Sequence, residues 1–401
     1  MKQIYFDNGA TTNIDKKVLK VMKPYFSEKY GNASSSHFKG SEAKEAIEKS
    51  RKIIADSINA KPEEIYFTSG GTESNNWVLK GLFFKNKSSE KGKVHIITTK
   101  IEHDCVLNTC KWLEKKFPEE VEITYLDVDK NGFVNPEDVK NSIKENTLVV
   151  SVIHGNNEIG SIQDMESIGE ICRDSGVLFH TDACQSFTKT EIDVIKQKID
   201  FVTLNSHKIH GPKGVGALYI REKIKNKLEP FFHGGGHENG MRSGTENIHG
   251  IVGFGEAVKI ANKLRYAKKM KKLRDKFIKR LVKIENIELN GPKENRLCNN
   301  INIRFNNIEG EAIEGYLEAK GIYVSTGSAC SSHTLEPSHV LRAIGLNPVQ
   351  ANTSIRITLS RFTTQKEIEY FLKELLYITK KLRKMSALTE EDSEKIKSDK
   401  S

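Results

Sequence analysis

A glycine-rich stretch in the first quarter of the chain has the composition of an anion-binding turn. Thr68-Ser-Gly-Gly-Thr-Glu-Ser-Asn-Asn76 follows a strand-like Ile65-Tyr-Phe and precedes a helical pattern at Trp77. Glycines and hydroxyl side chains at the start of a helix would expose backbone N–H groups to an anion, and the helix dipole adds to the attraction. Taken alone, the stretch fits a phosphate site and also a plain turn with a helix N-cap.

Lys208 and Asp182 add the chemistry that a phosphate-bearing aldehyde needs. Lys208 lies in Asn205-Ser-His-Lys-Ile-His-Gly-Pro-Lys-Gly214, where a segment leaves a strand and turns. An amine held there could form a Schiff base, although most single lysines are surface charges. Asp182 ends the strand-like Val177-Leu-Phe-His-Thr-Asp and could pair with a pyridine nitrogen. The anion-binding turn, the lysine and the carboxylate together predict pyridoxal 5′-phosphate as the cofactor.

Cys330 is the candidate nucleophile among the six cysteines. It lies in Ser325-Thr-Gly-Ser-Ala-Cys-Ser-Ser-His-Thr-Leu-Glu-Pro337, a run of small and polar residues with the composition of a mobile loop. A reactive thiol must be accessible and partly ionised, and such a loop meets the first condition. The remaining cysteines lie in helical or strand patterns or behind Asp182, where a thiol acts as a small buried hydrophobe: Cys105, Cys110, Cys172, Cys184 and Cys298.

The elements that must position these residues alternate between strands and helices. Strand patterns fall at Val94–Thr98, Val121–Leu126, Leu148–Ile153, Val177–His180, Phe201–Leu204 and Val215–Ile220. Amphipathic segments such as Met165–Asp174 separate several of them, which predicts an α/β fold with a mostly parallel sheet. Ligands bind such sheets at the carboxyl ends of the strands. His103, Asn157, Asp182 and Lys208 fall at those ends.

A smaller α+β domain is expected after about Gly250, with one long helix ending near Val282 and strands at Asn300–Phe305 and Ser354–Leu359. We therefore expect a large cofactor-binding domain over 14–258. Residues 1–13 and 259–385 would form the small domain. Residues 386–401 lack the apolar residues needed for folding and are expected to be disordered.

Length, charge and cysteine spacing limit the other functions that the chain could have. A chain of 401 residues exceeds what one core usually organises, and no apolar run approaches the roughly 20 residues that span a bilayer. Without a signal or transit pattern, a cytoplasmic location without a membrane role is expected. The net charge of +10 is densest over 263–280, where helical spacing favours the exposed face of a helix over nucleic-acid binding. The cysteine spacing predicts neither a disulfide scaffold nor a zinc site.

The motifs together resemble cysteine desulfurases of the NifS/IscS kind, which belong to the class V aminotransferases of the aspartate-aminotransferase-like (fold type I) pyridoxal-phosphate superfamily. The resemblance runs from Tyr5 to about Thr364. It rests on Tyr5–Thr12, Tyr30–Asn32, Thr68–Asn76, Glu102-His103, His154–Gly160, Asp182–Gln185, Ser206–Lys208, Gly234–His237, Arg242–Asn247, Ser325–Cys330 and Ser354–Arg356.

The resemblance assigns a role to each candidate site residue. Lys208 would be the Schiff-base lysine, Asp182 the partner of the ring nitrogen, and Gln185 the partner of the phenolic oxygen. His103 would stack on the ring and move protons, or only stack. The phosphate would lie against Thr72, Asn205 and His207, Gly71 and Ser206 would also contact the cofactor, and Thr245 would reach the phosphate of a second subunit, which implies a homodimer. Asn157 would contact cofactor and substrate, and Arg356 would clamp the substrate carboxylate.

Two positions depart from the family pattern near the lysine. Asn205 stands where the family usually has serine, and Ser206 stands where a small Gly or Ala is common. An amide can still donate to a phosphate oxygen. The departure therefore concerns the detail of phosphate binding.

The resemblance implies an enzyme that converts L-cysteine to L-alanine. Cys330 would carry the sulfur as a persulfide to acceptor proteins, such as an iron–sulfur scaffold or a tRNA-thiolation relay. Other readings stay open on the same fold: a selenocysteine lyase, a cysteate- or kynurenine-type lyase, and a sulfur-transfer scaffold. Retention of Lys208, Asp182 and Cys330 argues against the scaffold alone.

Overall fold

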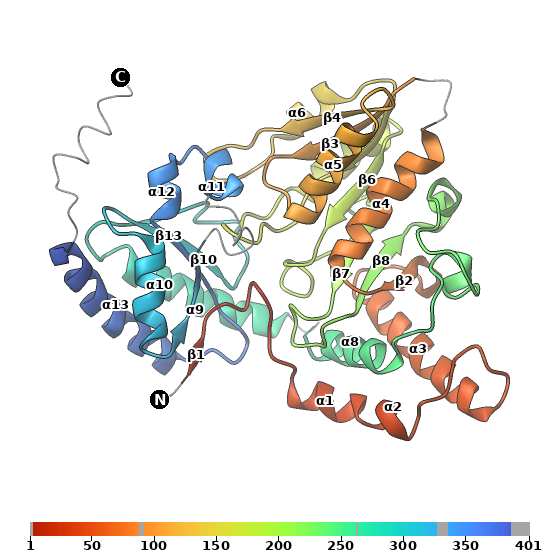
Figure 1. The fold of residues 1–401 in the computed structure, drawn as a ribbon, viewed down its shortest axis with the longest axis horizontal. Coiled ribbons are helices and arrows are strands. Elements are labelled where there is room, and N and C mark those ends of the chain that lie inside the picture. Colours follow the sequence, from red (N-terminus) through yellow and green to blue (C-terminus); the bar gives the residue numbers. More distant parts are fainter. Residues whose placement is uncertain (1–2, 88–91, 262–263, 327–335, 386–401) are drawn as a thin grey trace.

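A computed structural model of the chain describes residues 3–87, 92–261, 264–326 and 336–385. They form a large lobe and a smaller lobe, joined side by side (Figure 1). The expected tail at 386–401 and the Cys330 segment lie outside the described residues. Within the described ranges, no helix combines the length and apolarity that a membrane crossing needs.

A seven-stranded sheet forms the centre of the large lobe, in the order β2-β8-β7-β6-β5-β3-β4. The strands β7, β6, β5, β3 and β4 are parallel, whereas β8 is antiparallel to both β7 and β2. Because β8 reverses between them, β2 runs in the same direction as β7. The bounds are β2 Ile65–Thr68, β3 Val94–Thr99, β4 Val121–Leu126, β5 Thr147–Ser151, β6 Leu178–Asp182, β7 Phe201–Asn205 and β8 Gly216–Ile220.

Helices cover both faces of this sheet, which explains why most of its strands are apolar throughout. Residues of α3, α6, α7 and α8 share one buried apolar cluster with the sheet, and residues of α4 and α5 share another. The helices of this lobe are α1 Lys16–Met22, α2 Pro24–Ser27, α3 Phe38–Asp56, α4 Gly71–Asn86, α5 Asp104–Lys116, α6 Pro136–Ser142, α7 Met165–Asp174 and α8 Ile248–Ala261. Three short 3₁₀ helices lie at Pro62–Glu64, Glu222–Lys227 and Glu238–Gly240.

The small lobe contains an antiparallel sheet in the order β12-β13-β10-β9 and a separate parallel pair, β1 with β11. Helices α9, α10 and α13 pack on these strands around a third apolar cluster. The strands are β1 Ile4–Tyr5, β9 Ile287–Leu289, β10 Asn300–Phe305, β11 Ile322–Tyr323, β12 Ser325–Thr326 and β13 Ser354–Thr358. The helices are α9 Arg265–Leu281, α10 Gly310–Glu318, α11 His339–Ala343, α12 Pro348–Asn352 and α13 Gln365–Met385.

The α/β fold with a mostly parallel sheet is confirmed, and every strand predicted in the large lobe is present within a few residues. The expectation of one helix from about Gly250 to Val282 is wrong. Two helices, α8 and α9, occupy this stretch, and Leu264 before α9 has a left-handed backbone with φ of 39°. A right-handed helix cannot continue through that conformation. The helix after the glycine-rich stretch begins at Gly71, six positions before the helical pattern at Trp77.

The N-terminal segment connects the two lobes. After β1, Asp7 bridges to Thr358 of β13 in the small lobe. The chain then crosses to the large lobe, where Thr12 donates its N–H to the His207 carbonyl at 3.0 Å. This crossing, drawn in red in Figure 1, places residues 7–12 beside the carboxyl ends of the central strands.

Candidate active site

The carboxyl edge of the central sheet brings together residues that are far apart in the sequence. This edge includes the end of β2, because that strand runs with the parallel set. Gly71 follows β2, His103 follows β3, Asn157 follows β5, Asp182 ends β6 and Lys208 follows β7. The sequence-based expectation that polar residues gather at this edge is therefore confirmed for the strands that carry them.

Asp182 is buried and accepts hydrogen bonds from Asn75 and Cys184. The Asn75 side-chain amide donates to Oδ2 at 2.7 Å, and the backbone N–H of Cys184 donates to Oδ1 at 2.9 Å. Asn75 lies in the second turn of α4, and its Oδ1 is buried without a hydrogen-bond partner among the described residues. These bonds orient the carboxylate. Sequence reasoning missed Asn75, although it lies within the glycine-rich stretch.

The start of α4 requires glycine at two positions, at Gly70 for its backbone conformation and at Gly71 for its close packing. Gly70 has φ of +155°, a conformation that L side chains rarely adopt. A Cβ added to Gly71 would lie 2.6 Å from Cys184 Sγ and 3.9 Å from Asn205 Nδ2. Thr72 follows in the first turn and is exposed. The Asn205 amide therefore lies on the same side as the helix N-terminus, as a phosphate site needs.

The residues before Lys208 face different surroundings. His207 Nδ1 lies 3.0 Å from Thr11 Oγ1, and burial, together with Lys208, Lys213 and Lys189, lowers the pKa of His207 to about 4. His207 is therefore neutral near pH 7. The Ser206 hydroxyl is buried against Gly211, where an added Cβ would come within 2.0 Å of it. This orientation gives no support to the expected cofactor contact through the Ser206 side chain.

Lys208 and Gln185 meet at the N-terminal segment. Lys208 Nζ donates to the Ala10 carbonyl at 2.6 Å and also to the Gly9 carbonyl. Gln185 Nε2 donates to the same Gly9 carbonyl at 2.8 Å. The segment that crosses between the lobes therefore lies over the lysine. Gly9 and Ala10 belong to a motif that sequence reasoning quoted without giving it a role.

His103 is the N-cap of α5. Its Nδ1 accepts the backbone N–H of Cys105 at 3.2 Å and lies 3.1 Å from the Cys105 thiol. Burial lowers the pKa of His103; the negative charge of Asp182 opposes this effect, and the positive charge of Lys208 adds to it. A neutral imidazole is therefore the form present near pH 7.

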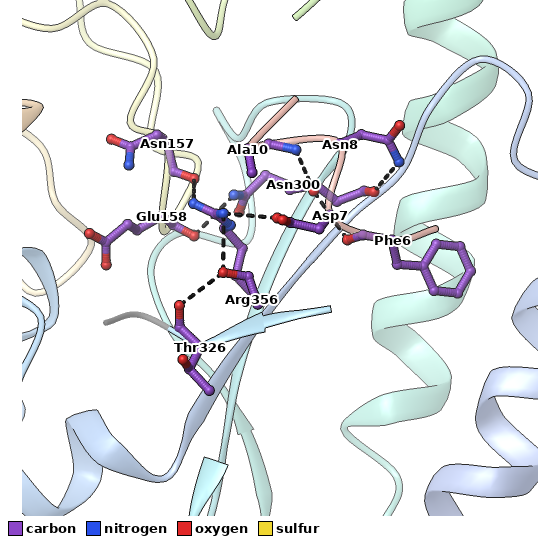
Figure 2. Close-up of polar contacts among 12 residues, drawn as sticks. Phe6, Asp7, Asn8, Ala10, Asn157, Glu158, Asn300, Thr326 and Arg356 are labelled. Carbon is purple, nitrogen blue, oxygen red and sulfur yellow. Dashed lines mark hydrogen bonds and ion pairs between the residues drawn. The ribbon is translucent and has the colours of Figure 1, made fainter. Parts of the chain in front are cut away.

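Arg356 lies on β13 at the boundary between the lobes, and Figure 2 shows its surroundings. Its Nη2 pairs with Asp7 Oδ1 at 3.0 Å, and its Nη1 donates to the Asn157 carbonyl at 3.3 Å. Arg356 Nε and Asn157 Oδ1 are both buried without a hydrogen-bond partner among the described residues. The two residues expected to receive substrate thus lie together with unused polar atoms. Sequence reasoning did not assign Asp7 as their ionic partner.

Thr245 lies apart from Lys208, in the segment before α8. It is exposed and lines a cavity together with Ser69, Gly214 and Asn247. The neighbouring Arg242 pairs with Glu73 of α4, with Nε 2.9 Å from Oε1. The role expected for Thr245 toward a second subunit stays a prediction, as does that of Cys330 outside the described residues.

Comparison with known proteins agrees with this arrangement. The model of the family described as aminotransferase class-V matches residues 4–371, and the chain belongs to that family. It is 47% identical to "Cysteine desulfurase IscS" of Methanosarcina thermophila over 390 residues, which cover 97% of this chain and 95% of the relative.

Two solved structures extend the likeness to the fold. A "NIFS-like protein" superposes with a TM-score of 0.88 at 39% identity, covering 95% of this chain and all of the other. A structure titled "SspA in complex with cysteine" gives a TM-score of 0.80 at 38% identity, covering 90% of this chain and all of the other. The recognised resemblance to this family is therefore confirmed.

Proposed function

We propose that the protein is a pyridoxal-phosphate-dependent cysteine desulfurase. It converts L-cysteine and the Cys330 thiol to L-alanine and a Cys330 persulfide, so the substrate C–S bond breaks, an S–S bond forms and the substrate carbon gains a proton. The observation that carries the proposal is the convergence of Asp182, fixed by Asn75, with Lys208 at one edge of the sheet. The names of the relatives support the same activity.

The residues present fit pyridoxal phosphate. An oriented buried carboxylate at Asp182 suits a protonated pyridine nitrogen, and the close approach at Gly71 leaves the α4 N-terminus and the Asn205 amide for a phosphate. When bound, the cofactor supplies an electron sink for the carbanion formed at the substrate Cα. Gln185 and His207 lie on the same edge as further polar contacts.

The protein side chains bind the substrate and move protons. The Arg356 guanidinium binds the substrate carboxylate, with the Asn157 amide beside it, which accounts for the polar atoms left unused there. Lys208 Nζ moves the proton of the substrate Cα. His103 takes the proton of the substrate thiol or adjusts its charge, since burial keeps its imidazole neutral and able to accept a proton.

Assembly and location complete the proposal. We propose a homodimer in which Thr245 contributes to the partner's phosphate site, an acceptor protein that takes the sulfur for iron–sulfur assembly or another product, and a cytoplasmic location. We also propose the domain division at 14–258 against 1–13 with 259–385. The separate apolar clusters of the two lobes support that division.

The test compares the native protein with Cys330→Ala and Lys208→Ala. We expect a yellow native protein that releases alanine from L-cysteine in the presence of a thiol reductant. Cys330→Ala should stay yellow and release none, whereas Lys208→Ala should lose the native absorption band and the activity. A native protein that stays colourless after incubation with pyridoxal phosphate would overturn the proposal. Selenocysteine cleavage retained by Cys330→Ala would instead favour the lyase reading.

A further inference from the structure

The Cys105 thiol lies between two residues of the candidate active site. Its Sγ is 3.1 Å from His103 Nδ1 and 3.1 Å from Asn75 Nδ2. Asn75 Nδ2 also donates to Asp182, and the Thr72 side chain hydrogen-bonds the same thiol. Cys105 thus joins the carboxylate at the end of β6 to the imidazole at the start of α5, which is more than the filling of space expected of a small buried hydrophobe.

The hydrogen bonds among Asn75, Cys105 and His103 have one consistent assignment of donors and acceptors. His103 Nδ1 accepts the backbone N–H of Cys105 as the N-cap of α5, so this nitrogen carries no proton in the neutral ring. The Asn75 amide donates one N–H to Asp182 and the other to Cys105 Sγ. A sulfur that accepts from Asn75 has its own S–H available for Nδ1.

The thiol keeps its proton near neutral pH. Burial, reinforced by the negative charge of Asp182, raises the pKa of Cys105 to about 12. It therefore acts as a weak hydrogen-bond donor and not as an anion beside the imidazole.

We propose that Cys105 is a positioning residue that holds His103 in the neutral tautomer protonated at Nε2. The backbone N–H and the thiol of Cys105 both point at Nδ1, and Asn75 links this arrangement to Asp182. A methyl side chain at position 105 would keep only the backbone bond, whereas a hydroxyl could replace the thiol as a donor.

The consequence concerns the direction in which His103 passes a proton, and this part rests on the proposed function. With Nδ1 occupied, His103 presents an N–H at Nε2 and acts there as a donor. It takes up a proton only at Nδ1, by giving up the bonds from Cys105. The charged and titratable groups facing the ring are Asp182, Lys208, Asp104 and His339. Cys105 adds a neutral donor to that set.

The test measures the tautomer directly and needs no turnover. Histidine labelled with ¹⁵N in the full-length protein reports the protonation of each ring nitrogen by NMR, and His103→Gln identifies the signal of His103. At neutral pH we expect an Nε2–H tautomer. In Cys105→Ala, the share of the Nδ1–H tautomer and the pKa of His103 should both rise, and Cys105→Ser should restore both to the native pattern.

Cys110→Ala is the matched control, because Cys110 is a buried cysteine of the same helix and forms no hydrogen bond with His103 among the described residues. It should leave the His103 signal unchanged. An Nδ1–H tautomer in the native protein would overturn the inference even if no variant folds. An unchanged His103 signal in a folded Cys105→Ala would overturn it as well. Failure of the desulfurase activity would leave these readings intact, so the two proposals fail separately.

Discussion

The Asn75 side-chain amide donates a 2.7 Å hydrogen bond to Asp182 Oδ2 and so couples α4 of the large lobe to the carboxylate at the end of β6. The two residues are 107 positions apart in the sequence. The bond places a buried acid at the base of the site without a cationic partner among the hydrogen bonds described for it. A carboxylate held in this way suits a ligand that brings its own positive charge.

Asn75→Ala should weaken cofactor binding. The variant leaves one oxygen of a buried carboxylate without its donor, which costs about 1–3 kcal/mol, or roughly 5- to 150-fold in affinity. Titration of the cofactor-free protein with pyridoxal phosphate, followed by absorbance, measures the change. Asn76→Ala on the same helix is the control, because the Asn76 amide donates to the Thr72 carbonyl of its own helix and not to Asp182 among the described residues. Equal affinity for Asn75→Ala and the native protein would refute this role.

Gly71→Ala should impair the same binding by a steric route. The new Cβ would lie 2.6 Å from Cys184 Sγ, so the start of α4 must shift. Removing that sulfur in the double variant Gly71→Ala/Cys184→Ala should recover much of the affinity. Gly315→Ala is the control for a helical glycine, since an added Cβ there has no described atom within 4 Å. No recovery in the double variant would mean that the contact with Cys184 is not the cause.

Arg356→Lys should raise the KM for L-cysteine by about 10-fold or more, because an ammonium cannot form the bidentate contact of a guanidinium. Steady-state alanine release at varied L-cysteine measures this effect. The partly exposed Asp7 keeps a cationic partner in the lysine variant, which limits the loss of stability. Arg304→Lys on neighbouring β10 should leave KM unchanged. If KM rises equally in both variants, substrate binding by Arg356 is wrong.

The pH dependence of stability should report on Glu102. Burial raises the pKa of Glu102 to about 8, above its usual 4.5. The unfolded chain therefore releases this proton at lower pH than the folded protein. The contribution of Glu102 to stability is fully present below about pH 4.5 and is lost as the pH rises to about 8, at about 1.4 kcal/mol per pH unit. Thermal unfolding of the native protein and of Glu102→Gln can be compared at about pH 5, 6.5 and 8, which span this window. The melting temperature of the variant should rise relative to that of the native protein as the pH increases. Parallel profiles would contradict the expectation.

A buried ion pair should hold the segment before α8. Arg51 of α3 contacts Glu238 through two hydrogen bonds of 2.7 and 2.8 Å, and Glu238 also accepts the N–H of Phe67. Glu238→Ala removes the buried partner of Arg51, leaves it paired with the half-exposed Glu48, and should cost at most about 3–5 kcal/mol of stability. Urea unfolding measures the loss. Glu222→Ala, which breaks an exposed pair with Lys61, should change little. A Glu238→Ala as stable as Glu222→Ala would show that the pair contributes nothing.

The alternation of strands and helices could be predicted from the sequence, because each strand is a short apolar run and apolar residues recur in each helix with the helical period. The position of Lys208, Asp182 and His103 at one edge followed from the rule for parallel sheets. Contacts between side chains were not readable. The bond from Asn75 to Asp182 and the pair of Arg356 with Asp7 depend on how the elements pack, and the change of direction at Leu264 interrupts an apolar pattern that looks continuous.

The orientation of Ser206 illustrates the same limit. Its position in the lysine motif predicted a contact with the cofactor, yet its hydroxyl is turned toward Gly211 by the tight turn that follows. Asn205 was expected to take the place of the usual serine, and its amide does lie beside the start of α4. The local sequence places both residues beside Lys208. The backbone conformation determines that Asn205, and not Ser206, faces the carboxyl edge of the central sheet.

The most direct test of the central claim is mass spectrometry of the Cys330 peptide after the protein has been treated with L-cysteine without a reductant. The account predicts that Cys330 gains the mass of one sulfur atom, that a thiol reductant removes it, and that Lys208→Ala shows no gain. A native protein that consumes L-cysteine while Cys330 stays unmodified, or that gains sulfur equally well in Lys208→Ala, would contradict it.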